Sequence, residues 1–202
     1  MFGSELQQLL QLIGKLPGLG PRSARRVVLH FLKNRQTLVP CLLKSLKHVT
    51  DRYQPCSVCG YFDGQDPCFF CTSHVRDSHT VCVVAHTGDV WALERASFFK
   101  GRYHVLGGVL SAFHNCQPSD LNLDSLKKRV NSGVKEVVMA LDGNIEGQTT
   151  LHYVVQELLK EAPCLKISSL ARGMPMGGEL ESMDQATLMS AFLGRQDFSK
   201  PL

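Results

Sequence analysis

The chain has 202 residues, of which 44% are hydrophobic and 20% are charged. This composition suits one compact body or two small ones with a buried core, and it excludes an intrinsically disordered protein. No uninterrupted apolar stretch approaches the roughly 20 residues that a membrane helix needs, and residues 1–5 lack a basic region followed by an apolar core. We therefore expect a cytoplasmic protein with no membrane contact.

The net charge of +4 is unevenly distributed along the chain. Residues 1–54 contain nine lysines and arginines but only two carboxylates, Glu5 and Asp51, which gives this part a charge of +7. The remaining residues carry −3. A basic end on a mildly acidic body indicates that a polyanion binds at that end.

Residues 1–54 are predicted to form a small helical unit. Apolar residues recur at helical spacing from residue 6 to residue 16, and residues 17–21 end that helix with two glycines that are free to adopt positive φ. Pro21 suits the first turn of a second helix, whose apolar face consists of Ala24, Val27, Val28, Phe31 and Leu32. Thr37 is the predicted cap of a third helix, whose inward-facing residues are Leu38, Cys41, Leu42, Leu46 and Val49.

Residues 55–76 contain two close cysteine pairs, Cys56-Ser-Val-Cys59 and, after eight intervening residues, Cys68-Phe-Phe-Cys71. Each pair places two thiolates on one tight turn, and two such turns can close a tetrahedron around Zn²⁺. Four sulfur ligands leave no position for a catalytic water, so one structural zinc ion per chain is predicted. A segment this short cannot bury a core unaided, and metal binding would fold it. The alternatives are four reduced buried cysteines or a redox pair.

Residues 77–172 are predicted to form an α/β layer. Continuous apolar runs, typical of strands covered on both faces, occur at residues 81–85, 103–106 and 137–141, with a shorter run at 165–167. Helical segments at residues 89–95, 124–131 and 149–161 are long enough for crossovers, so a mostly parallel sheet is expected. Trp91 and the scattered cysteines are predicted to be buried apolar groups; these cysteines are Cys41, Cys82, Cys116 and Cys164.

The segment Leu16-Pro-Gly-Leu-Gly-Pro-Arg-Ser-Ala24 resembles the helix-hairpin-helix motif of DNA-repair proteins. In that motif, glycines let the N–H groups of the hairpin and of the following helix approach a phosphate without reading base sequence. The predicted DNA-binding residues are two glycines and four basic residues: Gly18, Gly20, Lys15, Arg22, Arg25 and Arg26. The alternative is an ordinary helical hairpin with a solvated basic face.

The α/β layer resembles the Toprim fold of primases and topoisomerases, with one strand ending at Ala85, Asp89 on the next helix, and a loop from Asp142 after a later strand. Toprim enzymes place a glutamate at the end of the first strand and an Asp-x-Asp pair after the later one, to hold Mg²⁺ at a phosphoryl group. Here Ala85 replaces the glutamate and Asn144 replaces the second aspartate. Asp142 and Glu146 are left as a candidate weak Mg²⁺ or partner site. The alternative for Asp142 is a cap of the next helix.

The order of these parts, followed by Arg172-Gly-Met-Pro-Met-Gly-Gly-Glu-Leu-Glu181, resembles the RecR family of bacterial recombination mediators over nearly the whole chain. The resemblance implies a multi-part α/β protein with a helix-hairpin-helix DNA-binding domain (1–54), a four-cysteine zinc finger (55–76), a Toprim-like domain (77–172) and a helical tail that takes part in subunit contacts (173–202). It further implies a homo-oligomer, a dimer or tetrameric ring, that binds DNA and acts with RecO and RecF to promote RecA loading on gapped DNA. Residues 184–192 have the pattern of a short amphipathic helix, for which the alternative is packing on its own domain.

Together these features predict a non-catalytic, DNA-binding mediator of recombinational DNA repair. The main alternative is a Mg²⁺-dependent Toprim nuclease or primase-like enzyme, which Ala85 disfavours because it can neither hold a metal nor move a proton. A third hypothesis is a protein-binding adaptor, which would have no salt-dependent affinity for DNA.

Overall fold

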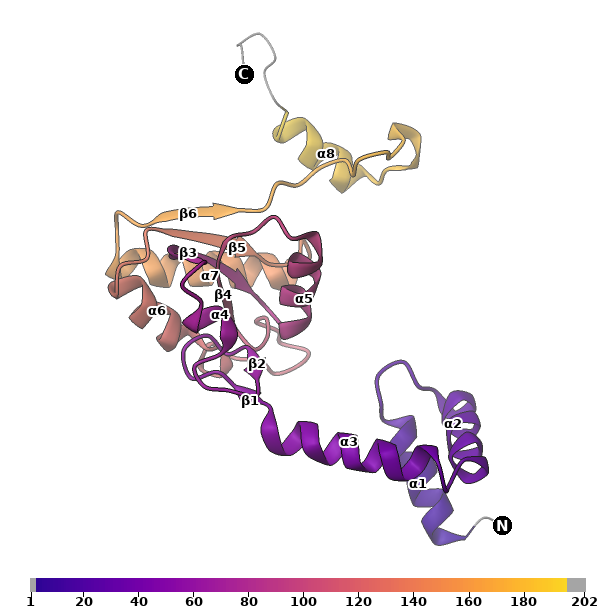
Figure 1. Ribbon diagram of the computed structural model, residues 1–202. Helices are drawn as coiled ribbons and strands as arrows, with labels where there is room; N and C mark the ends of the chain where they lie inside the picture. Colours follow the sequence, from indigo (N-terminus) through magenta and orange to yellow (C-terminus); the bar gives the residue numbers. More distant parts are fainter. Residues whose placement is uncertain (1–2, 196–202) are drawn as a thin grey trace. The chain divides into compact units, whose positions relative to one another are not determined.

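The computed structural model describes residues 3–195, and the chain divides into two compact units, Met1–Tyr53 and Gln54–Leu202 (Figure 1). Each unit is described by itself below. The finer division into four domains that the sequence suggests stays a prediction. No helix within residues 3–195 is long and apolar enough to cross a bilayer.

The first unit consists of three helices, as the spacing of its apolar residues predicts. These are α1 (Ser4–Gly14), α2 (Pro21–Lys33) and α3 (Leu38–Arg52). Helices α1 and α2 pack together, and a Cβ added at Gly14 would meet the Ala24 side chain at 3.8 Å. Ala24 and Val28 are the buried residues of α2, so its predicted apolar face is the face that packs.

The prediction that α3 turns its apolar side chains inward is wrong within the described residues. No residue of α3 is buried; Leu38, Cys41, Leu46 and Val49 are exposed, and Leu42 is half-buried. Helical spacing identifies an apolar stripe but does not say whether the same chain covers it. Within residues 3–53 nothing covers this stripe.

The second unit is built on a four-stranded parallel sheet with the order β4-β3-β5-β6, as expected. Its strands are β3 (Asp77–Val84), β4 (Gly101–Val105), β5 (Glu136–Ala140) and β6 (Lys166–Ser169). Central strand β3 sends alternate side chains to opposite faces. Val81 and Val83 join one apolar cluster, while Cys82 and Val84 join the other.

Different elements cover the two faces of this sheet. Helices α6 (Leu123–Asn131) and α7 (Ile145–Glu161) supply Leu126, Val154 and Leu158 to the first cluster. Helix α5 (Thr87–Ala96) supplies Val90 to the second cluster, and the cysteine-rich segment supplies the rest of that cover. That segment contains β1 (Gln54–Pro55) paired antiparallel with β2 (Phe62–Asp63), and the short helix α4 (Phe69–Thr72). The second half of β3 and most of β4 are therefore buried on both faces, as their continuous apolar runs predict. No residue of edge strand β6 is buried, so the expectation of cover on both faces is wrong for the shorter run at residues 165–167.

The C-terminal part of the chain contains two short helical elements, the 3-10 turn Leu180–Ser182 and α8 (Gln185–Leu193), and a further 3-10 turn, Pro118–Asp120, precedes α6. The Asp184 carboxylate accepts hydrogen bonds from the N–H groups of Ala186 and Thr187, at 2.9 and 3.0 Å, and so caps α8. The predicted helix over residues 184–192 is thus confirmed. Residues 196–202 of the predicted tail lie outside the described residues.

The prediction that Trp91 and the four scattered cysteines are buried is wrong for all of them except Cys82. The Trp91 side chain is 61% exposed, and its indole N–H donates to the Tyr61 hydroxyl at 3.1 Å. Cys41 and Cys164 are exposed and Cys116 is half-buried, so Cys82 alone of the four scattered cysteines is buried. A single cysteine or tryptophan that is not part of an apolar repeat can be assigned only from the average tendency of its residue type to be buried.

The core predicts a large difference between two neighbouring leucines of α7. Leu158 is 1% exposed and Leu159 is 38% exposed. We expect Leu158→Ala to lower the free energy of unfolding by about 2–5 kcal/mol, because it leaves a cavity against the sheet. The matched variant Leu159→Ala should cost less than half as much. Urea denaturation of both proteins checks this, and equal losses would contradict the assigned core.

Candidate metal centre and nucleic-acid interface

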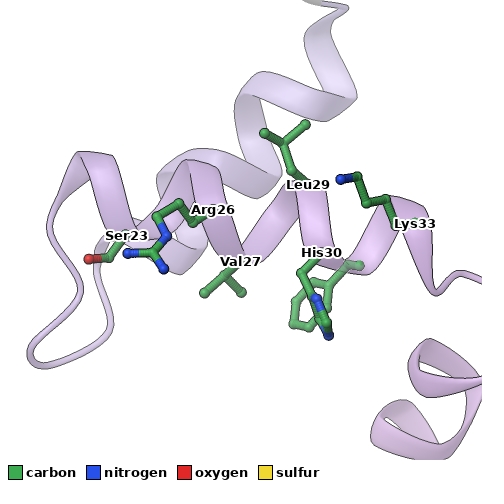
Figure 2. Close-up of a pocket in the computed structure, with 7 residues that line it drawn as sticks. Ser23, Arg26, Val27, Leu29, His30 and Lys33 are labelled. Carbon is green, nitrogen blue, oxygen red and sulfur yellow. The ribbon is translucent and has the colours of Figure 1, made fainter.

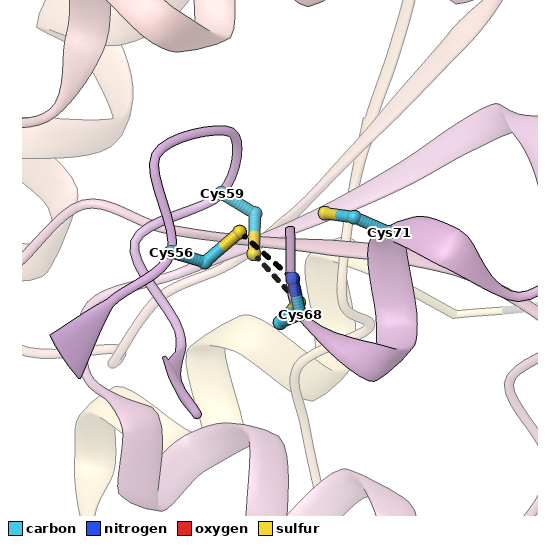
Figure 3. A group of neighbouring side chains, drawn as sticks. All are labelled: Cys56, Cys59, Cys68 and Cys71. Carbon is cyan, nitrogen blue, oxygen red and sulfur yellow. Dashed lines mark hydrogen bonds between the residues drawn. The ribbon is translucent and has the colours of Figure 1, made fainter. Parts of the chain in front are cut away.

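Two tight turns bring four cysteines together beside the sheet (Figure 3). The first turn carries Cys56 and Cys59, and the second carries Cys68 at the start of α4 and Cys71 within it. Cys56, Cys59 and Cys68 are buried and Cys71 is half-buried. The four residues that the spacing selects therefore meet at one point.

The spacing of the sulfur atoms fits a tetrahedral metal site. All four Sγ atoms lie within 4.8 Å of one another, and the Cys59 and Cys68 Sγ atoms are 3.4 Å apart. Four sulfurs bound to one zinc at ~2.3 Å would lie roughly 3.8 Å apart. A disulfide requires ~2.05 Å between its sulfurs, so Cys59 and Cys68 are free thiols rather than a disulfide pair.

Hydrogen bonds within the cluster distinguish its sulfurs. The Cys68 N–H donates to Cys56 Sγ at 3.3 Å. Hydrogen bonding to Cys59 lowers the pKa of Cys68, while hydrogen bonding to Cys68, together with burial, raises the pKa of Cys59. A divalent ion that binds the four sulfurs would displace their protons.

Two carboxylates brace the turns that carry the cysteines. Asp66 accepts from the N–H and the hydroxyl of Ser57, at 2.8 and 2.9 Å, and these bonds lower the pKa of Asp66. Asp63 accepts from the Phe69 N–H at 2.8 Å. Both turns are thus fixed by bonds that need no metal, which places the sulfurs before an ion binds.

The cysteine segment is seated directly on strand β4. The Val105 N–H donates to the Cys59 carbonyl at 2.7 Å. Gly60 has φ of +75°, and a Cβ at this position would lie 2.7 Å from the Val105 carbonyl oxygen, so glycine is required there. Phe70 packs edge-on against Tyr103, with ring centroids 5.3 Å apart. Sequence reasoning found the ligands but not this contact, because the pairing is non-local.

The predicted hairpin lies between α1 and α2. Gly18 adopts φ of +76°, whereas Gly20 has φ of −78°, so positive φ is required at one of the two glycines rather than both. Pro21 occupies the first turn of α2, as predicted. No side chain caps the start of α2 and its first turn holds no acidic residue, which leaves a helix N-terminus suited to an anion.

Basic side chains gather on the exposed side of α2. The predicted residues Arg22, Arg25 and Arg26 are all exposed, and Lys15 is exposed at the end of α1. His30 and Lys33, which the sequence analysis did not select, continue the spacing of Arg22 and Arg26 along the helix. Arg26, His30 and Lys33 line a shallow hollow of about 680 Å³ (Figure 2). Counting four and seven residues onward from Arg26 would have identified His30 and Lys33.

The ends of β3 and β5 meet at one corner of the sheet, since Val84 pairs with Ala140. This corner brings together the positions of the Toprim pattern, but the side chains there have other partners. Ala85 is buried, and the Asp89 carboxylate accepts from the His86 N–H at 2.8 Å at the start of α5.

The two acidic residues predicted at this corner belong to no group of three or more potential metal ligands within residues 3–195, and their role as a weak Mg²⁺ or partner site stays a prediction. Asp142 is exposed, and Glu146 is half-buried with its carboxylate accepting from the Ser111 hydroxyl. Asn144, not Asp142, caps α7, by accepting from the Gly147 N–H at 2.7 Å. Within residues 3–195, the four cysteines are the only group of three or more potential metal ligands that lie together.

The comparisons with known proteins follow the same order of parts. The family profile described as "RecR, helix-hairpin-helix" matches residues 6–50, a Toprim domain profile matches residues 79–171, and "RecR, C-terminal" matches residues 173–196. Recombination protein RecR of Parvibaculum lavamentivorans is 46% identical over 197 residues, covering 97% of this chain and 98% of that protein. The chain belongs to the RecR family.

Further RecR proteins resemble the chain to a similar degree. The protein from Erythrobacter litoralis is 48% identical over 97% of this chain and 98% of its own length. That from Azorhizobium caulinodans is 49% identical over 96% of each chain. These RecR proteins match the chain from the helical unit to the tail, so the resemblance seen in its motifs is confirmed over nearly the whole sequence.

We expect the purified protein to contain one zinc ion per chain. Cys59→Ser should lose most of the metal, because a buried tetrahedral site with three sulfurs binds it far less tightly. Acidification should release the ion from the parent, since protons compete with it for the thiolates. Metal analysis and thiol titration check this.

Cys164→Ser provides the control, because Cys164 is exposed and lies outside the cluster. This variant should keep the full metal content. A parent protein without zinc, in which the four clustered thiols react freely in the native state, would contradict the metal centre.

Proposed function

We propose that this RecR family protein is a non-catalytic recombination mediator whose helical unit binds the DNA backbone without regard to base sequence. The observation that carries the proposal is the basic side of α2. Its exposed cations adjoin a helix N-terminus with no acidic residue in its first turn. A backbone phosphate satisfies both the N–H groups and the guanidinium groups of such a site.

The charge distribution supports binding to a polyanion rather than to a single small anion. The first 54 residues carry +7, and Arg22, Arg26, His30 and Lys33 follow one another along α2 at spacings that put them on one side. A row of cations matches a row of phosphates, and release of the counterions from DNA then favours binding. Lys15 and Arg25 extend the basic region, with Gly18 and Gly20 shaping the hairpin.

The four-cysteine cluster supports a structural rather than a catalytic metal in this function. We propose Zn²⁺ as its ion, because four thiolates saturate the tetrahedral coordination of zinc and leave no site for a water. Cys59 is bonded through its backbone to β4, so the ion would hold the segment on the sheet.

The Toprim corner supports a role in binding rather than turnover. Phosphoryl transfer with Mg²⁺ needs several carboxylates in one place, and Ala85 and Asn144 supply none. Asp142 and Glu146 are proposed as a partner site. A Mg²⁺-dependent nuclease or primase-like activity remains the alternative that the second experiment below tests.

By its family membership we propose that the protein acts with RecO and RecF to promote RecA loading on gapped DNA in the cytoplasm. A single hairpin should bind weakly, and a homo-oligomer, a dimer or tetrameric ring, would multiply the contacts through effective concentration. The exposed apolar side chains of α3, such as Leu46 and Val49, are consistent with a helix that another subunit covers.

The basic hairpin predicts a specific loss of DNA binding. We expect Arg22→Glu combined with Arg26→Glu to weaken binding by at least tenfold and to reduce the dependence of log affinity on log salt by about 2, because two phosphate contacts are lost. Both side chains are exposed, so the fold should be retained. Fluorescence anisotropy with DNAs of different sequence, at several salt concentrations, measures both effects.

The control is Lys44→Glu combined with Lys47→Glu, which changes the charge equally on exposed positions of α3. It should weaken binding less than threefold. If the two double variants lose affinity equally, general charge rather than the hairpin accounts for binding. No loss in either would make the DNA-binding assignment wrong.

We expect no nuclease, primase or topoisomerase turnover from the purified protein with Mg²⁺, because the Toprim corner lacks the carboxylates that would hold the ion. Nicking of plasmid DNA and incorporation of labelled nucleotides are the measurements. Activity that follows the protein through purification, requires Mg²⁺ and disappears in Asp142→Ala would establish the enzyme instead.

A further inference from the structure

Two arginines next to the cysteine cluster have no acidic partner. Arg102 lies on β4 and Arg129 lies on α6, and both are half-buried. Within residues 3–195, no carboxylate lies within ion-pair distance of either guanidinium, whereas Arg76 pairs with Glu94 at 2.6 Å. A half-buried cation without a counter-charge is costly, so a negative group is expected nearby.

Hydrogen bonds fix both arginines in place but leave their charge uncompensated. Arg129 Nη1 donates to the Tyr103 carbonyl at 2.6 Å. Arg102 Nη2 donates at 3.2 Å to the carbonyl of Ser73, which lies two residues after Cys71. The Arg102 Nε is buried and has no hydrogen-bond partner. Carbonyl groups satisfy N–H donors, but they carry no net charge.

A cavity joins these arginines to the cysteine turn. It has a volume of about 390 Å³, and its lining includes Arg102, Arg129 and the two residues between the first pair of cysteines, Ser57 and Val58. The Ser125 hydroxyl, one turn before Arg129 on α6, donates to the Val58 carbonyl at 3.0 Å. The same helix therefore both contacts the cysteine turn and presents Arg129 beside it.

Both arginines adjoin residues that flank the cysteines. Arg102 bonds to the carbonyl of Ser73, which follows Cys71 by two residues, and Arg129 shares its cavity with Ser57 and Val58, which lie between Cys56 and Cys59. Burial lowers the pKa of Arg129, as expected of a cation that lacks a counter-charge. Thiolates that bind a metal at this cluster would supply negative charge beside the pair.

We propose that Arg102 and Arg129 are positioning residues that neutralise the charge of the metal-bound cysteine cluster. Through them, metal binding stabilises the packing of α6 against β4. This rests on the proposed zinc centre. Zinc bound to four thiolates carries a net charge of about −2, and a buried dianion needs two cations close by. In the metal-free chain, no carboxylate of residues 3–195 lies within ion-pair distance of either guanidinium, so their charge stays uncompensated. Arg129 and Arg102 therefore stabilise the loaded state and destabilise the empty one.

The test compares Arg129→Met and Arg102→Met with Arg95→Met in the full chain. Arg95 is exposed on α5 and does not line the cavity, so this control makes the same substitution away from the pair. The measurements are the rate of metal release to a colorimetric chelator and the thermal midpoint with and without bound metal. We expect each arginine variant to release metal about tenfold faster or more, and the control to stay within twofold of the parent.

The thermal midpoints separate charge compensation from simple packing. Loaded arginine variants should melt below the loaded parent, whereas metal-free variants should melt at or above the metal-free parent. Arg129→Lys, which keeps the charge, should release metal at a rate closer to that of the parent, and it serves if Arg129→Met does not fold. If the metal-free chain shows no melting transition, the rate of metal release alone tests the proposal.

The proposal would be overturned if both arginine variants released metal as slowly as the parent. It would also be overturned if the variants lowered the thermal midpoint equally with and without bound metal. The proposal would also be overturned if inorganic phosphate raised the thermal midpoint of the parent but not of the arginine variants, while the rate of metal release stayed the same in all of them. Arg102 and Arg129 would then bind a free anion. A parent that holds no metal would instead refute the zinc centre itself, so the two failures are distinguishable.

Discussion

Central strand β3 buries side chains on both faces of the sheet, and the rest of the second unit follows from the need to cover them. Val81 and Val83 face α6 and α7, while Cys82 and Val84 face α5 and the cysteine-rich segment. A parallel sheet exposed on either face would leave these apolar residues in water. The cysteine segment is therefore part of the core, and its metal site is built into the cover of one face.

This position explains why a small metal module affects a larger domain. Cys59 bonds to Val105 on β4, Phe70 packs on Tyr103, and Ser125 of α6 bonds to the turn between Cys56 and Cys59. The segment that carries the four cysteines is therefore bonded to both α6 and β4. Any ion bound by the four sulfurs is thus coupled to the packing of the sheet.

The two candidate functional regions differ in how much they rely on this packing. The proposed DNA-binding surface on α2 consists of exposed charges and a helix N-terminus, which belong to one helix and one hairpin. The Toprim corner depends on the adjacent ends of β3 and β5, where the Asp89 and Glu146 carboxylates accept hydrogen bonds. In the function proposed above, this fold would serve as a frame for binding rather than for phosphoryl transfer.

The sequence by itself determined the features that depend on local spacing. The helices of the first unit, the strands of the sheet, the cysteine ligands and the short helix near residues 184–192 follow from apolar periodicity or short motifs, which act over a few residues. Tertiary structure alone decided whether an apolar stripe finds a cover, as on α3, and whether Trp91 is buried. It also decided which residues far apart in the chain meet, as Gly60 does with Val105 and Ser125 with Val58. Such contacts depend on how strands pair and helices cross. The periodicity of one element shows which of its faces is apolar but does not identify the element that packs against that face.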